Sequence, residues 1–273
     1  HRDLHLSLRR QRQMCIRDRL ISLTDGKGAG EATEIFPTSD LNIWESEYKE
    51  LLDGKVIHPR FGSFVISLKG KLIVVDTGLN GPDGELLDDM KTKGIDRNQI
   101  GMVINTHLHP DHVGWNLSNG QPTFPNARYL VPKHDWDYWT GPKIINDAPW
   151  VTDSVIPLHE GRILDLIEGE YDITPEIKAV PTPGHTPGHI SISITSNGYH
   201  GFILGDVAHS PAQAEYTDWS PAFDLDPDLA RDTRHKVFDK LERENILVAA
   251  GHFPKPGFGR IKSSKGRRYW IIE

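Results

Sequence analysis

The sequence contains one cysteine, Cys15, among its 273 residues. The rest of the chain therefore offers no disulfide, no thiolate metal ligand and no cysteine nucleophile. No apolar run approaches the roughly 20 residues that cross a bilayer. The net charge is −7, so the chain lacks the excess of basic residues that is typical of nucleic-acid-binding proteins. We expect a cytoplasmic protein with a small-molecule substrate, no membrane span and no nucleic-acid partner.

The motifs of several common enzyme classes are also missing. Ser154 and Ser191 have no Gly-x-Ser-x-Gly around them, which argues against a serine nucleophile at a sharp strand-to-helix turn. No P-loop or dinucleotide-binding glycine pattern follows an expected strand. The glycines of Gly26–Gly30 lack that spacing, so we expect a flexible loop there.

The first 19 residues differ from the remainder, with six arginines and two aspartates and so a net charge of +4. They have neither the apolar core of a signal peptide nor an amphipathic stripe. We interpret residues 1–19 as a disordered basic arm or as a non-native segment, because Gln13–Arg19 resembles a translated sequencing adapter. Residues 20–273 are then expected to form a single domain.

Strands and helices alternate along this domain, which predicts an α/β fold. The expected helices are Glu85–Lys93, Lys133–Trp139 and Asp228–Glu242. The segment Asp40–Leu52 also has helical spacing, and either covers a pocket or pairs with a second copy in a homodimer. The expected strands are Phe61–Leu68, Lys71–Asp76, Met102–Asn105, Ala127–Val131, Ile177–Val180, Ile190–Thr195, Gly201–Leu204, Ile246–Ala250 and Arg268–Ile272.

Polar and histidine-bearing segments follow several of these strands, and one of them is dense in metal-binding groups. His107, His109, Asp111 and His112 fall within six residues. Alternation on an extended backbone points His107 and His109 the same way, while Asp111 and His112 can turn toward a second centre. Imidazole and carboxylate suit Zn²⁺, Mn²⁺, Fe²⁺ or Co²⁺.

His107-Leu108-His109-Pro110-Asp111-His112 is identified as the HxHxDH signature of the metallo-β-lactamase superfamily. The loop Pro183–His189, the pair Gly205-Asp206, the pair Gly251-His252 and Asp76 in Val-Asp-Thr-Gly resemble the family's other site elements, in the family's order. The resemblance covers about residues 55–255. It implies an αββα sandwich in which two mixed sheets are flanked by helices.

The resemblance also implies a ligand set. One metal would be held by His107, His109 and His185, and a second by Asp111, His112 and His252, with Asp206 bridging both. Asp76 would orient a ligand imidazole and His189 would be a supporting residue. His209, Trp115 and Phe253 are candidate pocket residues, because each lies close in sequence to an expected ligand.

Such a pair of divalent metals, with zinc preferred over manganese, iron or cobalt, would lower the pKa of a bridging water so that hydroxide forms near neutral pH. Asp111 or Asp206 could then carry the proton to the leaving oxygen. Gly205–Ser210, Trp219–Asp224 and Gly251–Pro254 look like the branch that contains methyl parathion hydrolase and the acyl-homoserine lactonases. We expect hydrolysis of a lactone or ester, with phosphotriesters as side substrates. A glyoxalase II-like thioesterase and a persulfide dioxygenase with a single iron are the alternatives.

Overall fold

The computed structural model describes residues 19–273. The expected arm therefore lies outside the described residues, apart from Arg19, which begins the first strand. Among the described residues, no helix is long and apolar enough to span a bilayer.

The first of two large sheets has six strands in the order β1-β5-β6-β7-β10-β11. β1, β5 and β6 pair antiparallel, whereas β6, β7, β10 and β11 run parallel. The ends of these four parallel strands therefore share one edge, where loops can meet. The six strands are β1 (Arg19–Lys27), β5 (Arg60–Leu68), β6 (Lys71–Val75), β7 (Ile100–Ile104), β10 (Arg128–Pro132) and β11 (Leu164–Ile167).

The second large sheet has seven strands in sequence order from β12 to β18. Its pairs are antiparallel except β15 and β16, which are parallel and joined through a long crossover. Both sheets are therefore mixed, as expected. The seven strands are β12 (Tyr171–Thr174), β13 (Ile177–Pro181), β14 (Ile190–Ser196), β15 (Tyr199–Ile203), β16 (Leu247–Ala249), β17 (Phe258–Ser264) and β18 (Arg267–Ile272).

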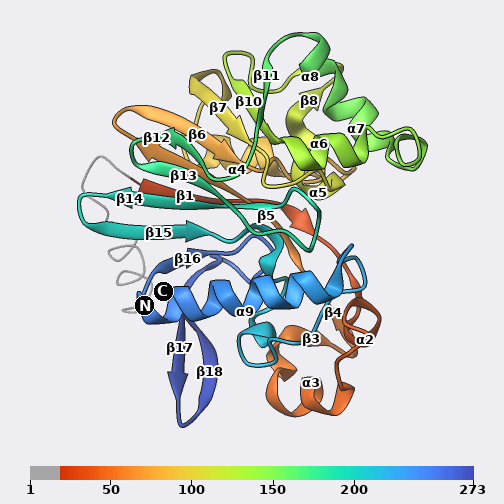
Figure 1. Ribbon diagram of the computed structural model, residues 1–273, viewed down its shortest axis with the longest axis vertical. Helices are drawn as coiled ribbons and strands as arrows, with labels where there is room; N and C mark the ends of the chain where they lie inside the picture. The colour runs from red at the N-terminus through yellow and green to blue at the C-terminus, as the bar shows by residue number, and fades with distance from the viewer. Residues whose placement is uncertain (1–18) are drawn as a thin grey trace.

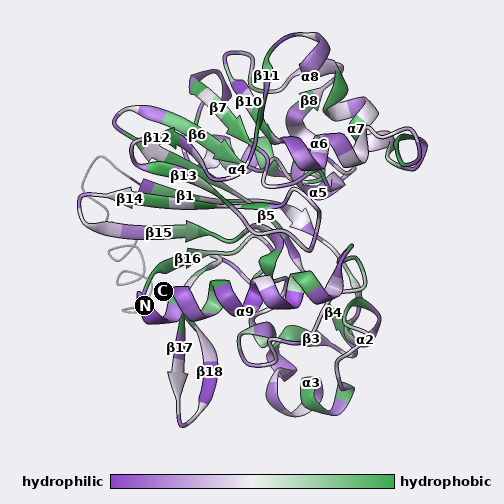
Figure 2. Cartoon of the chain, viewed as in Figure 1, coloured by the Kyte–Doolittle hydropathy of each residue, from purple (hydrophilic) through white to green (hydrophobic). Residues whose placement is uncertain are grey.

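The period-two pattern of the strands sends alternate side chains to opposite faces of each sheet. In β5, Phe64 and Ile66 enter a core between the two sheets, where they meet Ile192 and Ile194 of β14, while Val65 enters a second core on the helical side. A third core lies between the second sheet and α9 (Pro227–Arg243). The result is a helix–sheet–sheet–helix arrangement, visible as layers in Figure 1 and as apolar central strands in Figure 2. The predicted fold class is confirmed.

Helix α9 shows why such a layer forms. Asp226 caps its first turn by accepting a hydrogen bond from the Leu229 amide, and Pro227 stands at the first helical position. Ala230, Arg234, Phe238 and Leu241 are its buried residues and make one stripe at helical spacing.

The other helices are α2 (Ala32–Ile35), α3 (Leu41–Glu47), α4 (Leu86–Thr92), α5 (Pro110–Val113), α6 (Lys133–Trp139), α7 (Pro149–Ser154) and α8 (Ile156–Glu160).

Two local expectations need correction. Gly26–Gly30 is not a free loop: it ends β1 and begins β2 (Gly30–Glu31), and the Gly28 amide donates to the Pro59 carbonyl. The expected helix Asp40–Leu52 is interrupted at Tyr48, between α3 and a 3₁₀ turn. β4 (Val56–Ile57) pairs with β2 on one side and with β3 (Leu52–Asp53) on the other, so strand pairing takes up the end of the glycine segment and the last residue of the expected helix. The short hairpin of β8 (Leu117–Ser118) and β9 (Gln121–Pro122) completes the fold.

Candidate metal centre

The candidate site lies where five strands of the two sheets end. Asp76 follows β6, His107 follows β7, His185 lies between β13 and β14, Asp206 follows β15 and His252 follows β16. The Asp76 amide bonds to the Ile104 carbonyl, and the Ile190 amide bonds to the Thr106 carbonyl, so the loops of the two sheets are joined by backbone hydrogen bonds.

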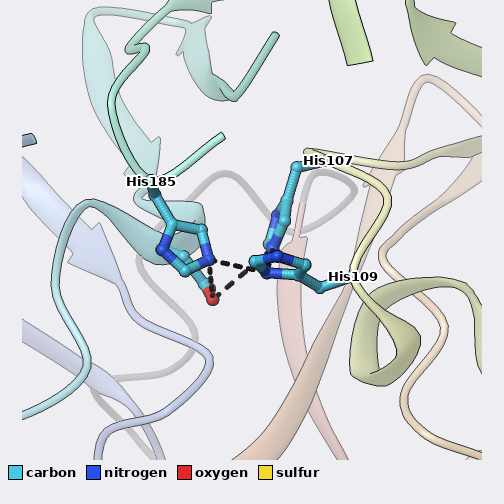
Figure 3. A group of neighbouring side chains, drawn as sticks. His107, His109 and His185 are labelled. Atoms are coloured by element: carbon cyan, nitrogen blue, oxygen red, sulfur yellow. Dashed lines mark hydrogen bonds and ion pairs between the residues drawn. The ribbon is translucent and has the colours of Figure 1, made fainter. Parts of the chain in front are cut away.

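Three histidines from two loops form what we call the first cluster: His107, His109 and His185. His109 Nδ1 lies 3.1 Å from His107 Nε2 and 2.8 Å from His185 Nε2. Figure 3 shows the three rings converging, with His107 and His109 on one loop and His185 on another. Their nitrogens lie within 4.8 Å of one another and of an Asp206 oxygen.

A second cluster comprises Asp111, His112 and His252, and its ligand atoms are equally close together. The Asp111 carboxylate lies 3.7 Å from His112 Nε2 and 3.6 Å from His252 Nε2. Helix α5, which starts with Pro110, turns the chain immediately after His109 and thereby brings Asp111 and His112 to this second position. The six histidine and aspartate side chains of the two clusters are therefore brought together as expected.

Asp206 lies between the clusters and is 3 % exposed. Its Oδ2 is 3.2 Å from His185 Nε2 and 3.1 Å from His252 Nε2, and its Oδ1 is 3.2 Å from His112 Nε2. Although they are 3.2 Å apart, the buried Asp206 Oδ1 and His112 Nε2 form no hydrogen bond with each other or with any other group of the described residues. A buried polar atom without a partner is costly, and a cation between such atoms would satisfy both. The donor set therefore fits divalent metal ions.

The titration behaviour of these groups follows from their burial and mutual charge. Burial, followed by the charge of neighbouring histidines, holds the pKa values of His107 and His109 well below the usual range. Burial opposes protonation of His185 too, but hydrogen bonds to Asp206 and Asp224 raise its pKa to about 9. Burial would raise the pKa of Asp206, but the surrounding histidines keep it well below the ordinary value. The aspartate is therefore ionised, as a bridging ligand must be.

Asp76 supports the second cluster through its contact with His112. Its Oδ2 lies 2.9 Å from His112 Nδ1, and its Oδ1 accepts a 2.7 Å bond from the Thr106 amide. Its backbone has φ 59°, a left-handed conformation that costs energy in a residue other than glycine. That conformation persists because the Asp76 carboxylate ties the start of the His107 loop to His112.

Two further supports of ligand histidines were not expected from the sequence. Asp224 Oδ1 lies 2.9 Å from His185 Nδ1, and Asp224 Oδ2 accepts a bond from the buried Arg234. The Arg60 carbonyl accepts a 2.8 Å bond from His252 Nδ1, and the Arg60 guanidinium binds the carbonyls of Phe253 and Ala250. Partners of this kind fix the tautomer and orientation of a ligand histidine. No sequence signal marks them, because both are distant in the chain from the histidines they hold.

His189 and His209 contact Asp206 from two further directions. His189 Nε2 accepts a 2.8 Å bond from the Asp206 amide, and burial lowers the pKa of His189 to about 3. Gly205 has φ 58°, and a Cβ there would meet His189 Nε2 at 2.5 Å, so only glycine fits. His209 Nε2 lies 3.0 Å from Asp206 Oδ2, and its ring stacks on His252 with centroids 5.0 Å apart.

A pocket of about 430 Å³ opens onto the two clusters. Its apolar wall contains Ile35, Phe61, Leu79 and Phe223. The residues of its metal-facing side are His109, Pro110, Asp111, Asp206, His209 and His252. His209 thus lines the pocket, as the sequence analysis expected, whereas none of the four apolar residues was expected there.

Trp115 and Phe253, expected as pocket walls, do not line this pocket. The Trp115 indole donates to Asp25 and packs against the helical-side core. Phe253 is fully buried in the core beneath α9, with its ring edge-on to Trp270. Closeness in sequence to a ligand misled the prediction, because each side chain turns into the adjacent hydrophobic core.

The family model of the metallo-beta-lactamase superfamily matches residues 63–252, and the chain belongs to that superfamily. The N-acyl homoserine lactonase AiiA of Bacillus thuringiensis subsp. kurstaki is 24 % identical over 225 residues, covering 74 % of this chain and 84 % of the relative. The N-acyl homoserine lactonase AttM of Rhizobium radiobacter is 28 % identical over 177 residues, covering 63 % of this chain and 65 % of the relative.

Solved structures agree with this assignment. The hydrolase AbOPH of the beta lactamase superfamily superposes with a TM-score of 0.88 and 25 % identity, covering 95 % of this chain and 96 % of the other. AidC, a dizinc quorum-quenching lactonase, has a TM-score of 0.83 and 24 % identity, with 94 % of each chain covered. The predicted family, its lactonase-like branch and the class of metal-dependent hydrolase are confirmed.

Proposed function

We propose that this metal-dependent hydrolase opens the ring of N-acyl homoserine lactones, with two divalent ions, zinc preferred, held by the first cluster, the second cluster and Asp206. The observation that carries the proposal is the pocket, in which an apolar wall faces a metal-ligand surface. An acyl homoserine lactone has the same division, with an apolar acyl chain attached to a polar ring. The lactonases among the relatives support the same substrate class.

The ligand arrangement favours two ions over one. The first cluster supplies three imidazole nitrogens, and the second supplies two nitrogens and a carboxylate, with Asp206 within reach of both. A single iron would leave one of these buried sets without a partner. This supports hydrolysis over the oxygenase alternative. When bound, the ions would supply activated water and polarise the scissile carbonyl.

The protein's own groups would supply orientation and proton transfer. Ile35, Phe61, Leu79 and Phe223 would bind the acyl chain and exclude water around it. Asp111 and Asp206 both line the pocket, but Asp111 is half-buried, whereas Asp206 is 3 % exposed. The greater exposure of Asp111 supports the proposal that Asp111, rather than Asp206, would accept the proton of the attacking water and deliver it to the leaving alkoxide. Asp206 would orient both halves of the site.

The test is ring opening of N-hexanoyl homoserine lactone by the full chain loaded with Zn²⁺ or Mn²⁺, and the reaction is monitored through the protons that it releases. We expect rapid opening that a chelator abolishes and that Asp206→Asn loses. Asp218→Asn, the same change at an exposed carboxylate that contacts His235, should keep the activity. If a protein holding two metals fails to open the lactone, the substrate assignment is wrong. Aryl esters, phosphotriesters and glutathione thioesters would then be assayed in its place.

A further inference from the structure

Asp135, in the first turn of α6, is a buried carboxylate that belongs to neither ligand cluster. Its Oδ2 accepts a 2.9 Å bond from the Leu108 amide, and its Oδ1 accepts a 2.7 Å bond from the Gly188 amide. Leu108 stands between His107 and His109, and Gly188 lies three residues after His185. One carboxylate therefore joins the two loops that carry all three histidines of the first cluster.

The packing around Asp135 leaves little freedom to either loop. A Cβ on Gly188 would lie 2.3 Å from the Asp135 amide nitrogen, so the His185 loop rests directly on the start of α6. The Leu108 carbonyl, in the next peptide unit, accepts a 2.7 Å bond from the Trp150 indole. Leu108 itself is fully buried in the helical-side core. Both polar groups of the residue between the two ligands are thus fixed by side chains.

Asp135 keeps this position at an energetic cost. Burial raises its pKa, against the Thr186 hydroxyl and the two backbone amides, which favour the carboxylate. A buried carboxylate is expensive unless hydrogen bonds or an opposite charge offset its lost hydration. Here the offsetting hydrogen bonds are those that join the two ligand loops, and an apolar residue could not make them.

We propose that Asp135 is a positioning residue that sets the geometry of the first cluster and leaves the second cluster unaffected. The second cluster has its own support, Asp76 at His112 and the Arg60 carbonyl at His252. The inference rests on the proposed metal assignment, and it predicts an asymmetry that a general loss of stability would not produce.

The experiment measures metal affinity in two single-cluster backgrounds, by titrating the full chain with Co²⁺ alone and following its ligand-field absorption. His252→Ala disables the second cluster and leaves the first, and His109→Ala does the reverse. Adding Asp135→Asn should weaken Co²⁺ binding about 10- to 100-fold in the His252→Ala protein. It should leave the affinity and spectrum of the His109→Ala protein unchanged.

Asp25→Asn is the matched control. Asp25 is as buried as Asp135 and also accepts backbone amides, from Leu79, Asn80 and Leu86, none of which adjoins a ligand. This variant should lower the unfolding temperature but preserve Co²⁺ affinity in both backgrounds. Equal weakening of the two backgrounds by Asp135→Asn, or no weakening, overturns the proposal.

Trp150→Phe tests the support of the same residue, Leu108, should Asp135→Asn fail to fold. It removes only the indole donor to the Leu108 carbonyl and keeps an aromatic ring at a half-buried position. We expect a smaller loss of Co²⁺ affinity, again confined to the His252→Ala background, and a loss in both or neither contradicts the proposal. If the His252→Ala protein by itself binds no Co²⁺, the metal assignment fails and this inference fails with it. Unchanged affinity in a metal-binding His252→Ala protein overturns the inference alone.

Discussion

Asp224 Oδ1 lies 2.9 Å from His185 Nδ1 in a fully buried pair that joins a candidate metal ligand to a loop 39 residues further along the chain. The opposite oxygen of Asp224 contacts Arg234, whose remaining donors bind the carbonyls of Val207, Thr217 and Trp219. His185 is thus connected through Asp224 to a cation on α9. The orientation of this ligand depends on a chain of contacts that extends well away from the metal centre.

Asp224→Asn should weaken metal binding about 10- to 100-fold, because an amide orients and polarises the His185 imidazole less well than a carboxylate. The measurement is zinc affinity by competition with a chromophoric chelator. Asp218→Asn, which changes an exposed carboxylate on the same segment, should leave the affinity unchanged. Equal affinities for the two variants would show that the His185–Asp224 contact does not support metal binding.

Arg234→Met should destabilise the fold by about 3–5 kcal/mol, because it leaves the Asp224 carboxylate buried without its cation. Urea unfolding of the metal-free protein measures this change. Arg231→Met removes an arginine on the same helix whose partner, Asp228, is exposed, and it should change stability little. A similar effect from both substitutions would contradict the structural role assigned to Arg234.

The stability of the metal-free protein should fall in acid partly through His189. Because the pKa of His189 is lowered from 6.5 to about 3 in the folded state, the unfolded chain takes up its proton first. The contribution is present above pH 6.5 and is lost as the pH falls toward 3, at up to about 1.4 kcal/mol per pH unit. His189→Gln should flatten this part of the curve of unfolding free energy against pH. An unchanged slope would rule out His189 as its source.

Phe223→Ala should raise the KM for long-chain acyl lactones more than for short-chain ones. Phe223 lines the pocket, with its ring 5.0 Å from His209, and its loss removes an apolar contact worth about 1–3 kcal/mol. Leu225→Ala is the control, because Leu225 is equally exposed two residues away and lies outside the pocket wall. Kinetics over a series of acyl lengths measures the difference. A uniform change across the series would place the acyl chain elsewhere.

The sequence by itself was sufficient for the features that are local in the chain. Apolar alternation in β5 and β6 determined which face of the sheet each residue covers, and the six residues from His107 to His112 determined where a metal centre begins. Asp206 and His252 were assigned through the resemblance to the metallo-β-lactamase superfamily, and each lies three residues after the end of a strand, β15 or β16.

Beyond Asp76, His189 and His209, only the tertiary structure decided which side chains support and enclose the centre. Asp135, Asp224 and the Arg60 carbonyl reach their partners through contacts between distant segments, and such contacts leave no spacing pattern in the chain. The prediction that Trp115 and Phe253 line the pocket failed for a related reason, since a residue close in sequence to a ligand can turn into the core. Phe61 and Phe223, which do line the pocket, come from other segments. Periodic patterns in the sequence reflect the local geometry of the backbone, whereas the residues that line a pocket depend on how helices and strands pack against one another.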